Sequence, residues 1–358
     1  MAGLLQRLLT RSGILPVLRS QWRADQTAAA SKLEKRLDKH LTELKGDVAR
    51  LSAELDERMH RLEPLLESVE RMARMERDVR MMRETMDVDI THRRRKIDYA
   101  ALLTSPGIAP HVQAAIRRAP VQDAPSVHVV IDDLLPPETY EALVDGIPPP
   151  IFFSQKDDTK QNLRVSNVHI APDWTFQMLT FLEEVLIPRI IVPALLQKLL
   201  PDIRDFYIRE YGPERGPALA AIPHEATRGR LMLRRPGYHL DPHLDPKRVV
   251  FTCLMYFARP GDSEAFGTTF YRMHGTPNID RTNTFYPETQ GIRCDPVKMV
   301  PFRPNSAVAF LNWGGAHGAD IPKDAPKDTE RYSYQFYVSP EPAALTALVG
   351  ETESAVVE

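Results

Sequence analysis

The sequence predicts an α+β protein in two parts: a long charged N-terminal helix, then a compact domain of short strands with flanking helices. Two observations carry this prediction. Over residues 22–95, apolar side chains recur every three or four positions, which is the spacing of a helical seam. From residue 229 onward, short apolar runs alternate with turn residues, which is typical of a β-sandwich or barrel.

Composition excludes several classes of protein. The chain has 358 residues, is 26% charged and has a formal net charge of -2, so no global basic field favours nucleic acid as a partner. Its two cysteines, Cys253 and Cys294, are too few for a disulfide scaffold or a cysteine-based zinc site. They fit a reducing compartment, and we predict a cytoplasmic protein. The sequence has no uninterrupted apolar run of about 18 residues, so we expect no transmembrane helix.

Residues 1–21 form a basic amphipathic lead-in, in which arginines are mixed with leucines and no acidic residue occurs. A secretory signal would separate its charges from a continuous apolar stretch, so secretion is not predicted. The segment fits the frayed start of the following helix, an amphipathic surface helix or a targeting segment. Peripheral membrane contact is therefore one open expectation.

Residues 22–95 are predicted to form a coiled coil. Pro64 should kink this helix or mark a join, and the phase of the seam moves after Met72. A seam this narrow needs a partner helix, so we expect a homo-oligomer, with a helix folded back as a hairpin as the alternative. The seam residues are Leu41, Leu44, Val48, Leu51, Leu55, Leu62, Leu65, Val69 and Met72.

The rest of the chain divides into a linker, a domain and a tail. Residues 96–125 contain several helix breakers and are predicted to be a short helical linker, and residues 343–358 a C-terminal tail. Residues 126–342 form the compact domain, with one or two helices over 174–200. Its expected strands lie at 127–131, 229–233, 249–257, 268–271, 307–311 and 331–338.

Two His-x-Asp pairs, His239/Asp241 and His243/Asp245, stand close together in the domain. A strand places residues i and i+2 on one face, so one pair can supply an imidazole and a carboxylate to the same cation. The apolar run that begins soon after Asp245 favours the second pair, and the first stays open. His317, in a bend of small residues after an apolar strand, is the expected third ligand.

Two histidines and one carboxylate suit non-haem Fe(II), because they leave coordination positions open. A zinc hydrolase accepts the same ligands. Arg331 favours the iron interpretation, since a guanidinium can hold the far carboxylate of a dicarboxylate in two parallel hydrogen bonds.

Together these motifs resemble the Fe(II)/2-oxoglutarate-dependent oxygenases, and in pattern the prolyl 4-hydroxylase type, over about residues 127–340. The resemblance implies a double-stranded β-helix, or jelly roll. It implies Fe(II) bound by His243, Asp245 and His317, with 2-oxoglutarate and dioxygen as co-substrates. It further implies that Arg331, Ser333 and Tyr256 bind 2-oxoglutarate, and it names no catalytic residue beyond the metal ligands.

The reaction that the resemblance implies is hydroxylation of an unidentified substrate, with release of succinate and carbon dioxide. Family members that halogenate vacate the carboxylate position, and here Asp245 fills it. The alternative is a catalytically inactive β-helix scaffold protein that oligomerises through its coiled coil.

Overall fold

The computed structural model describes residues 14–95, 98–154, 157–167, 170–227, 229–275 and 283–349. It divides into two units, residues 1–77 and 78–358. Most of the predicted lead-in, residues 1–13, and most of the predicted tail, residues 350–358, lie outside the described ranges. In the ranges that are described, no helix is both long enough and apolar enough to cross a bilayer.

Helix α2 (Ile14–Arg95) confirms the long N-terminal helix. It continues through Pro64, where a kink or a join was expected. A proline removes one backbone donor, and this long helix tolerates that loss. The predicted seam side chains of the first unit are exposed, from Leu41 at 46% to Leu44 at 64%. The described part of this unit therefore contains nothing that covers the seam.

The last turns of α2 belong to the second unit and are anchored there. Asp89 accepts a hydrogen bond of 3.0 Å from the backbone N–H of Asp173, and Arg95 forms a 2.9 Å ion pair with Asp145. Tyr99 stacks on Trp174 with ring centroids 4.0 Å apart. These contacts attach the C-terminal end of α2 to the compact unit.

The second unit is built on two antiparallel sheets, as the strand pattern predicts. The large sheet has the order β1 (Val121–Gln122), β2 (His128–Ile131), β10 (Ser306–Leu311), β7 (Phe251–Tyr256), β12 (Arg331–Pro340), β5 (Arg230–Arg234), β3 (Lys160–Leu163), with β4 (His224–Ala226) paired to β12. The small sheet has the order β6 (His239–His243), β11 (Ala316–Asp320), β8 (Thr268–Met273), β9 (Cys294–Val300).

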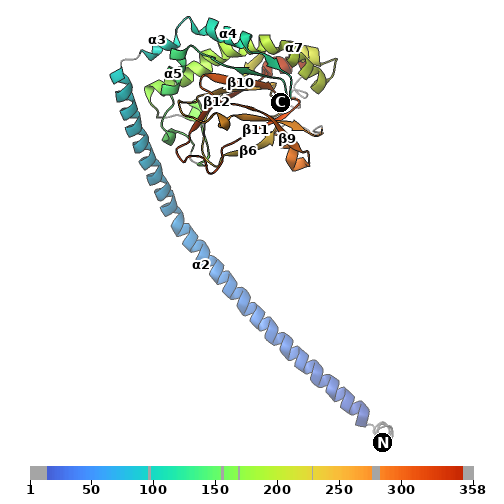
Figure 1. Ribbon diagram of the computed structural model, residues 1–358. Coiled ribbons are helices and arrows are strands. Elements are labelled where there is room, and N and C mark those ends of the chain that lie inside the picture. The colour runs from blue at the N-terminus through green and yellow to red at the C-terminus, as the bar shows by residue number, and fades with distance from the viewer. Residues whose placement is uncertain are drawn as a thin grey trace. The chain divides into compact units, whose positions relative to one another are not determined.

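Helices cover one face of the large sheet; α4 and α7 lie along it in Figure 1. The predicted linker segment contributes α4, whose Ile108, Val112 and Ile116 are buried in this core. The helices are α3 (Tyr99–Leu103), α4 (Ile108–Arg118), α5 (Pro137–Asp145), α6 (Asp173–Phe181), the π-helical η3 (Leu182–Ile191), α7 (Val192–Tyr211), α8 (Gly216–Ala221) and α9 (Pro342–Val349). Short 3-10 turns lie at η1 (Pro150–Phe152), η2 (Val165–Asn167), η4 (Glu264–Phe266) and η5 (Pro287–Gln290).

The opposite face of the large sheet packs on the small sheet. Strand β7 is apolar at every position but Thr252, because both of its faces are buried. Cys253 and Met255 join the core under the helices, while Leu254 and Tyr256 join a second core between the sheets. A strand buried on both faces needs apolar residues at both parities. Phe270 of β8 and Phe310 of β10 pack edge to face in the second core, with ring centroids 5.2 Å apart. The candidate site opens beside this core.

Candidate metal centre

Three predicted ligands meet where the strands of the small sheet pair. His243 is the last residue of β6, His317 is the second residue of β11, and the two are directly opposite in the antiparallel register. Asp245 follows β6, held by paired backbone hydrogen bonds of 2.8 and 2.9 Å between Leu244 and Phe285. The ligand atoms of His243, Asp245 and His317 all lie within 4.8 Å of one another, and all three residues are buried.

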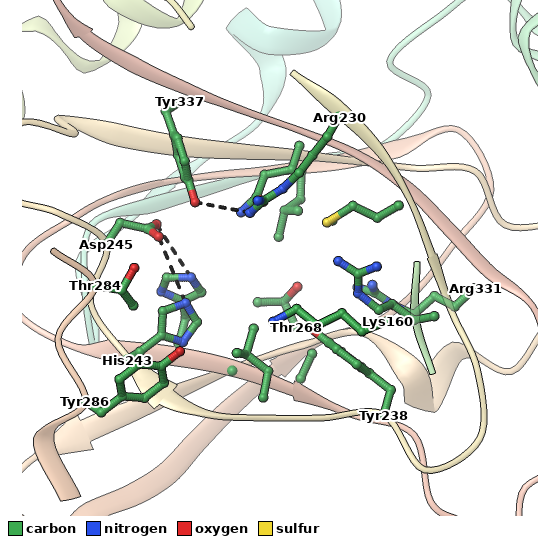
Figure 2. A pocket seen from close by; sticks show the side chains of 18 residues that line it. Lys160, Arg230, Tyr238, His243, Asp245, Thr268, Thr284, Tyr286, Arg331 and Tyr337 are labelled. Carbon is green, nitrogen blue, oxygen red and sulfur yellow. Dashed lines mark hydrogen bonds and ion pairs between the residues drawn. The ribbon is translucent and has the colours of Figure 1, made fainter. Parts of the chain in front are cut away.

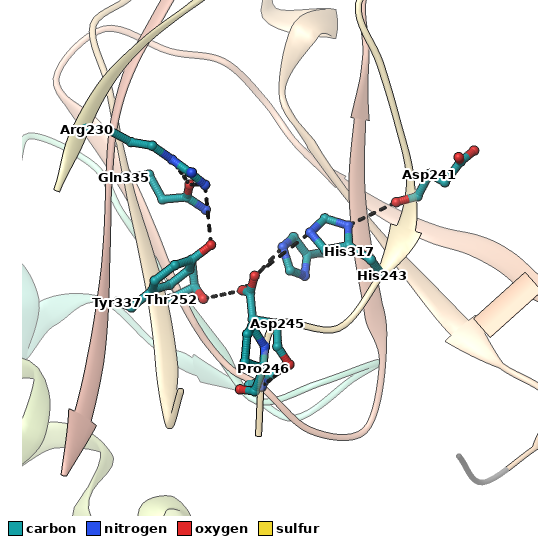
Figure 3. Close-up of polar contacts among 10 residues, drawn as sticks. Arg230, Asp241, His243, Asp245, Pro246, Thr252, His317, Gln335 and Tyr337 are labelled. Atoms are coloured by element: carbon teal, nitrogen blue, oxygen red, sulfur yellow. Dashed lines mark hydrogen bonds and ion pairs between the residues drawn. The ribbon is translucent and has the colours of Figure 1, made fainter. Parts of the chain in front are cut away.

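The two imidazoles face the carboxylate through their Nε2 atoms. His243 Nε2 lies 4.0 Å from Asp245 Oδ1, and His317 Nε2 lies 3.7 Å from Asp245 Oδ2 (Figure 3). The Nδ1–H of His243 donates to the backbone carbonyl of Asp241 at 2.9 Å. This hydrogen bond orients the ring and leaves the Nε2 lone pair directed at the cluster.

The carboxylate is positioned by Thr252, a residue that the sequence analysis missed. The Thr252 hydroxyl, fully buried on β7, donates to Asp245 Oδ2 at 2.5 Å. The side-chain amide of Asn312 donates to the backbone carbonyls of Asp245 and Pro246 at 2.8 and 2.9 Å. The sequence did contain a signal for this residue. Thr252 is the one hydroxyl among the apolar residues of this strand's first part, and it alternates with Leu254 and Tyr256, which face the core between the sheets.

Burial keeps both imidazoles neutral. Desolvation, and secondarily the neighbouring His243, lowers the pKa of His317 to about 3. Desolvation also lowers the pKa of His243. A neutral imidazole has a lone pair to donate to a metal. The two histidine nitrogens and a carboxylate oxygen of Asp245 lie within 4.8 Å of one another, so together they offer three donor atoms to one ion. This donor set fits a divalent metal such as Fe(II), and Zn(II) accepts it as well.

The competing pair lies elsewhere. His239 is exposed, and its two ring nitrogens lie 2.9 Å from Asp320 and 2.9 Å from the Asp241 side chain. The structure therefore brings His243 and Asp245 to His317, and leaves His239 and Asp241 in a surface ion-pair cluster.

His317 lies within strand β11, whereas the sequence analysis placed it in a bend. The bend covers residues 312–315 and includes Gly314, which has a φ of +87°, and β11 begins at Ala316. The glycines on either side of His317 are needed for close packing between strands. A Cβ at Gly318 would lie 2.6 Å from the carbonyl oxygen of Leu240, and one at Gly315 would lie 2.9 Å from that of Tyr271.

A cavity of about 230 Å³ adjoins the cluster, and its lining includes His243, Asp245, His317 and Arg331. Figure 2 shows Arg331 on the opposite side of this cavity from His243 and Asp245. Arg331 is 3% exposed and donates from Nε to the carbonyl of Phe266 and from Nη1 to the Ser333 hydroxyl at 3.4 Å. Among the described residues, no carboxylate forms an ion pair with its guanidinium.

Ser333 and Tyr256 lie behind the cavity lining. Both are buried, and neither contributes to the cavity wall. Ser333 accepts from Arg331, and the Tyr256 ring lies under the Arg331 guanidinium at 5.4 Å. The Tyr256 hydroxyl donates to Thr268 at 2.6 Å, and Thr268 does line the cavity. These two residues thus contact Arg331 and Thr268.

The cavity is also lined by three cationic residues that were not predicted from the sequence: Lys160, Arg230 and Arg234. Arg230 and Arg234 occupy the two ends of β5, at the parity that faces the cavity. Charged residues that repeat at the inward positions of a strand were the available signal, since alternation with period two places them on one face.

Solved structures similar to this chain include Fe(II)/2-oxoglutarate oxygenases. They include a prolyl-4-hydroxylase from Pseudomonas putida, at 13% identity over 65% of this chain and 100% of that chain, with a TM-score of 0.35. The non-heme alpha-ketoglutarate-dependent carbocyclase SnoK from nogalamycin biosynthesis is 12% identical over 66% of this chain and 87% of that chain, with a TM-score of 0.36.

A 2OG-Fe(II) oxygenase family oxidoreductase from Burkholderia pseudomallei is 10% identical over 66% of this chain and 91% of that chain, with a TM-score of 0.34. No family model and no curated protein matches the chain. At identities and TM-scores this low, the likeness does not establish what this chain does.

Proposed function

We propose that this protein is a non-haem Fe(II)- and 2-oxoglutarate-dependent dioxygenase, an oxidoreductase that hydroxylates its substrate, and that its two sheets form a double-stranded β-helix. One observation carries the proposal. A buried cluster of two histidines and one aspartate shares a cavity with a buried arginine that has no described acidic partner. A zinc hydrolase would use the first feature and leave the second unexplained.

His243, Asp245 and His317 would hold the metal, since their donor atoms converge and both imidazoles are neutral. Bound Fe(II) with 2-oxoglutarate would supply the activation of dioxygen, with succinate and carbon dioxide as by-products. Thr252 keeps the Asp245 carboxylate in place, and the carbonyl of Asp241 keeps the His243 ring in place. The protein thus preorganises the ligands.

Arg331 would bind the distal carboxylate of 2-oxoglutarate from the far side of the cavity. Its guanidinium is buried and poorly solvated, so a carboxylate that enters the cavity supplies a charge-assisted hydrogen bond that water does not. Ser333 and Tyr256 would act as positioning residues: Ser333 contacts the guanidinium, and Tyr256 orients Thr268.

The test is succinate formation by anaerobically purified protein supplied with Fe(II), 2-oxoglutarate and air, beside an Asp245→Ala variant. We expect slow succinate release without added substrate, lost in the variant. Release that is unchanged in the variant, or the absence of both succinate and Fe(II)-dependent binding of 2-oxoglutarate, would overturn the proposal. The second result would favour the inactive scaffold alternative.

We also propose that a second copy of this chain covers the exposed seam of α2 as a coiled coil. The support is the seam itself, in which leucines such as Leu51 and Leu55 are 61% and 63% exposed at helical spacing. Light scattering of the full chain should give a multimeric mass, and a Leu51→Glu/Leu55→Glu double variant should reduce it. A monomeric wild-type chain would contradict self-association. Cytoplasmic location and peripheral membrane contact stay predictions.

A further inference from the structure

The cavity contains more positive charge than the proposed reaction uses. Among its described lining residues four are cationic, Lys160, Arg230, Arg234 and Arg331, and Asp245 alone is acidic. A divalent metal and the 2-oxoglutarate dianion cancel each other's charge. The excess of cations therefore persists in the loaded enzyme, and a neutral substrate would leave it uncompensated in a partly desolvated space.

Three of these cations form a row across neighbouring strands. Arg331 of β12 is directly opposite Arg234 of β5, and Arg234 is directly opposite Lys160 of β3. Like charges at opposed positions of an antiparallel pair destabilise the sheet. A row of three such residues on one cavity wall therefore favours a bound anion, and the distal carboxylate of 2-oxoglutarate occupies only the Arg331 end.

The contacts of Arg234 do not neutralise it. Its guanidinium is 2% exposed and donates to the backbone carbonyls of Gln161 and Leu233 and to the side-chain carbonyl of Asn162, at 2.6, 3.0 and 3.0 Å. All three acceptors are uncharged. Burial lowers the pKa of Arg234, and the positive charge of Arg331 contributes in the same direction.

Lys160 stands at the exposed edge of the row. It lies on the edge strand β3 and is exposed, yet it lines the same cavity, beside Arg331 in Figure 2. Its backbone N–H donates to the Asp157 carboxylate at 3.1 Å, and the Lys160 charge contributes to lowering the pKa of Asp157. No carboxylate among the described residues lies within ion-pair distance of its ammonium group. Its charge is among those that act on the imidazole of His243, so the ammonium lies within electrostatic range of the candidate metal ligands. An ammonium on a long side chain that lines the cavity suits the capture of an anion.

Arg230 is the fourth cation and is held differently. It donates from Nε to Gln335 at 2.9 Å and from Nη2 to the Tyr337 hydroxyl at 3.4 Å, at the other end of β5. Figure 2 places it across the cavity from Lys160. It does not belong to the row.

We propose that Lys160 and Arg234 form a second oxyanion subsite, distinct from the Arg331 end of the row, and that the substrate of this oxygenase carries a carboxylate or phosphate group that binds there. The assignment of the substrate class rests on the proposed function. The anion would anchor the substrate against the wall formed by β5 and β3, so that the remainder of the molecule lies in the cavity that His243 and Asp245 also line.

The test titrates inorganic phosphate, and separately acetate, into the anaerobic Fe(II)-loaded chain saturated with 2-oxoglutarate, by calorimetry. We expect one Lys160-dependent anion per chain, with Lys160→Met weakening the binding at least about tenfold and Lys160→Arg restoring most of it. Tighter binding of phosphate than of acetate would indicate a phosphorylated substrate, and the reverse order a carboxylate. Lys198→Met, on α7 outside the cavity lining, is the charge-matched control and should bind like wild type.

Two results would overturn the subsite. One is the absence of anion binding in a chain that binds 2-oxoglutarate. The other is binding that persists unchanged in Lys160→Met, which would place the anion away from Lys160. The same titration without 2-oxoglutarate separates the two proposals. A chain that fails to bind 2-oxoglutarate but binds phosphate through Lys160 would refute the proposed reaction and retain the subsite.

Discussion

Replacement of Thr252 by valine tests whether the hydroxyl positions the candidate metal ligand Asp245. Valine matches threonine in shape and removes only the hydroxyl, which lies 2.5 Å from Asp245 Oδ2 in a fully buried position. A hydrogen bond to a buried charged group contributes about 1.5–3 kcal/mol. We therefore expect the variant to lose about 2 kcal/mol of unfolding free energy in the metal-free protein.

The more specific effect of Thr252→Val is on the metal. Residues that hydrogen-bond to a ligand typically change metal affinity by roughly 10- to 100-fold when they are removed. Anaerobic competition titration with Fe(II) should detect a loss in this range, and urea unfolding should measure the loss of stability.

The control is Thr252→Ser, which keeps the hydroxyl and deletes one buried methyl. It should be destabilised by about 1 kcal/mol and bind the metal nearly as well as wild type. Equal metal affinity of the valine variant and wild type would refute the role of Thr252. Equal loss in both variants would show that packing, and not the hydrogen bond, orients Asp245.

Three further predictions follow from single contacts. Arg331→Gln should raise the dissociation constant for 2-oxoglutarate by about 10- to 100-fold in anaerobic titrations, with metal affinity unchanged, because a buried charge-assisted hydrogen bond is lost; an unchanged constant would remove Arg331 from the co-substrate site. Asp320, and then Asp241, raises the pKa of His239 above 6.5, so the resulting stabilisation is present below pH 6.5 and is lost as the pH rises through the folded-state pKa. An NMR titration should place the His239 midpoint above 6.5 and lower it in Asp320→Asn, and identical midpoints would contradict the ion pair. Phe270→Ala should cost about 3–5 kcal/mol in urea unfolding, because it opens a cavity between the sheets; a loss below about 1 kcal/mol would mean that this core repacks.

Local patterns in the sequence were sufficient to predict the large elements. The seam of α2 is a short-range repeat of apolar residues, and each predicted strand is a short apolar run between turn residues, so period and length identify both. The candidate ligands His243 and Asp245 were visible because strand geometry relates positions two apart. The sequence favoured this pair over His239/Asp241 but did not decide between them, since both pairs have the same spacing and lie on the same face of the strand.

Only the tertiary structure decided which pair meets His317. The antiparallel register of β6 and β11 places His243 opposite His317 and His239 opposite Asp320, and register depends on contacts between distant segments. The same holds for the row of Arg331, Arg234 and Lys160, which come from three separate strands. Sequence by itself determined the long helix, the strands that are apolar runs and the chemical types of the candidate ligands, whereas strands such as β3 and β11 have no such run and were not predicted. Pairing between strands, which local periodicity does not encode, determined the candidate metal centre and the cationic wall beside it.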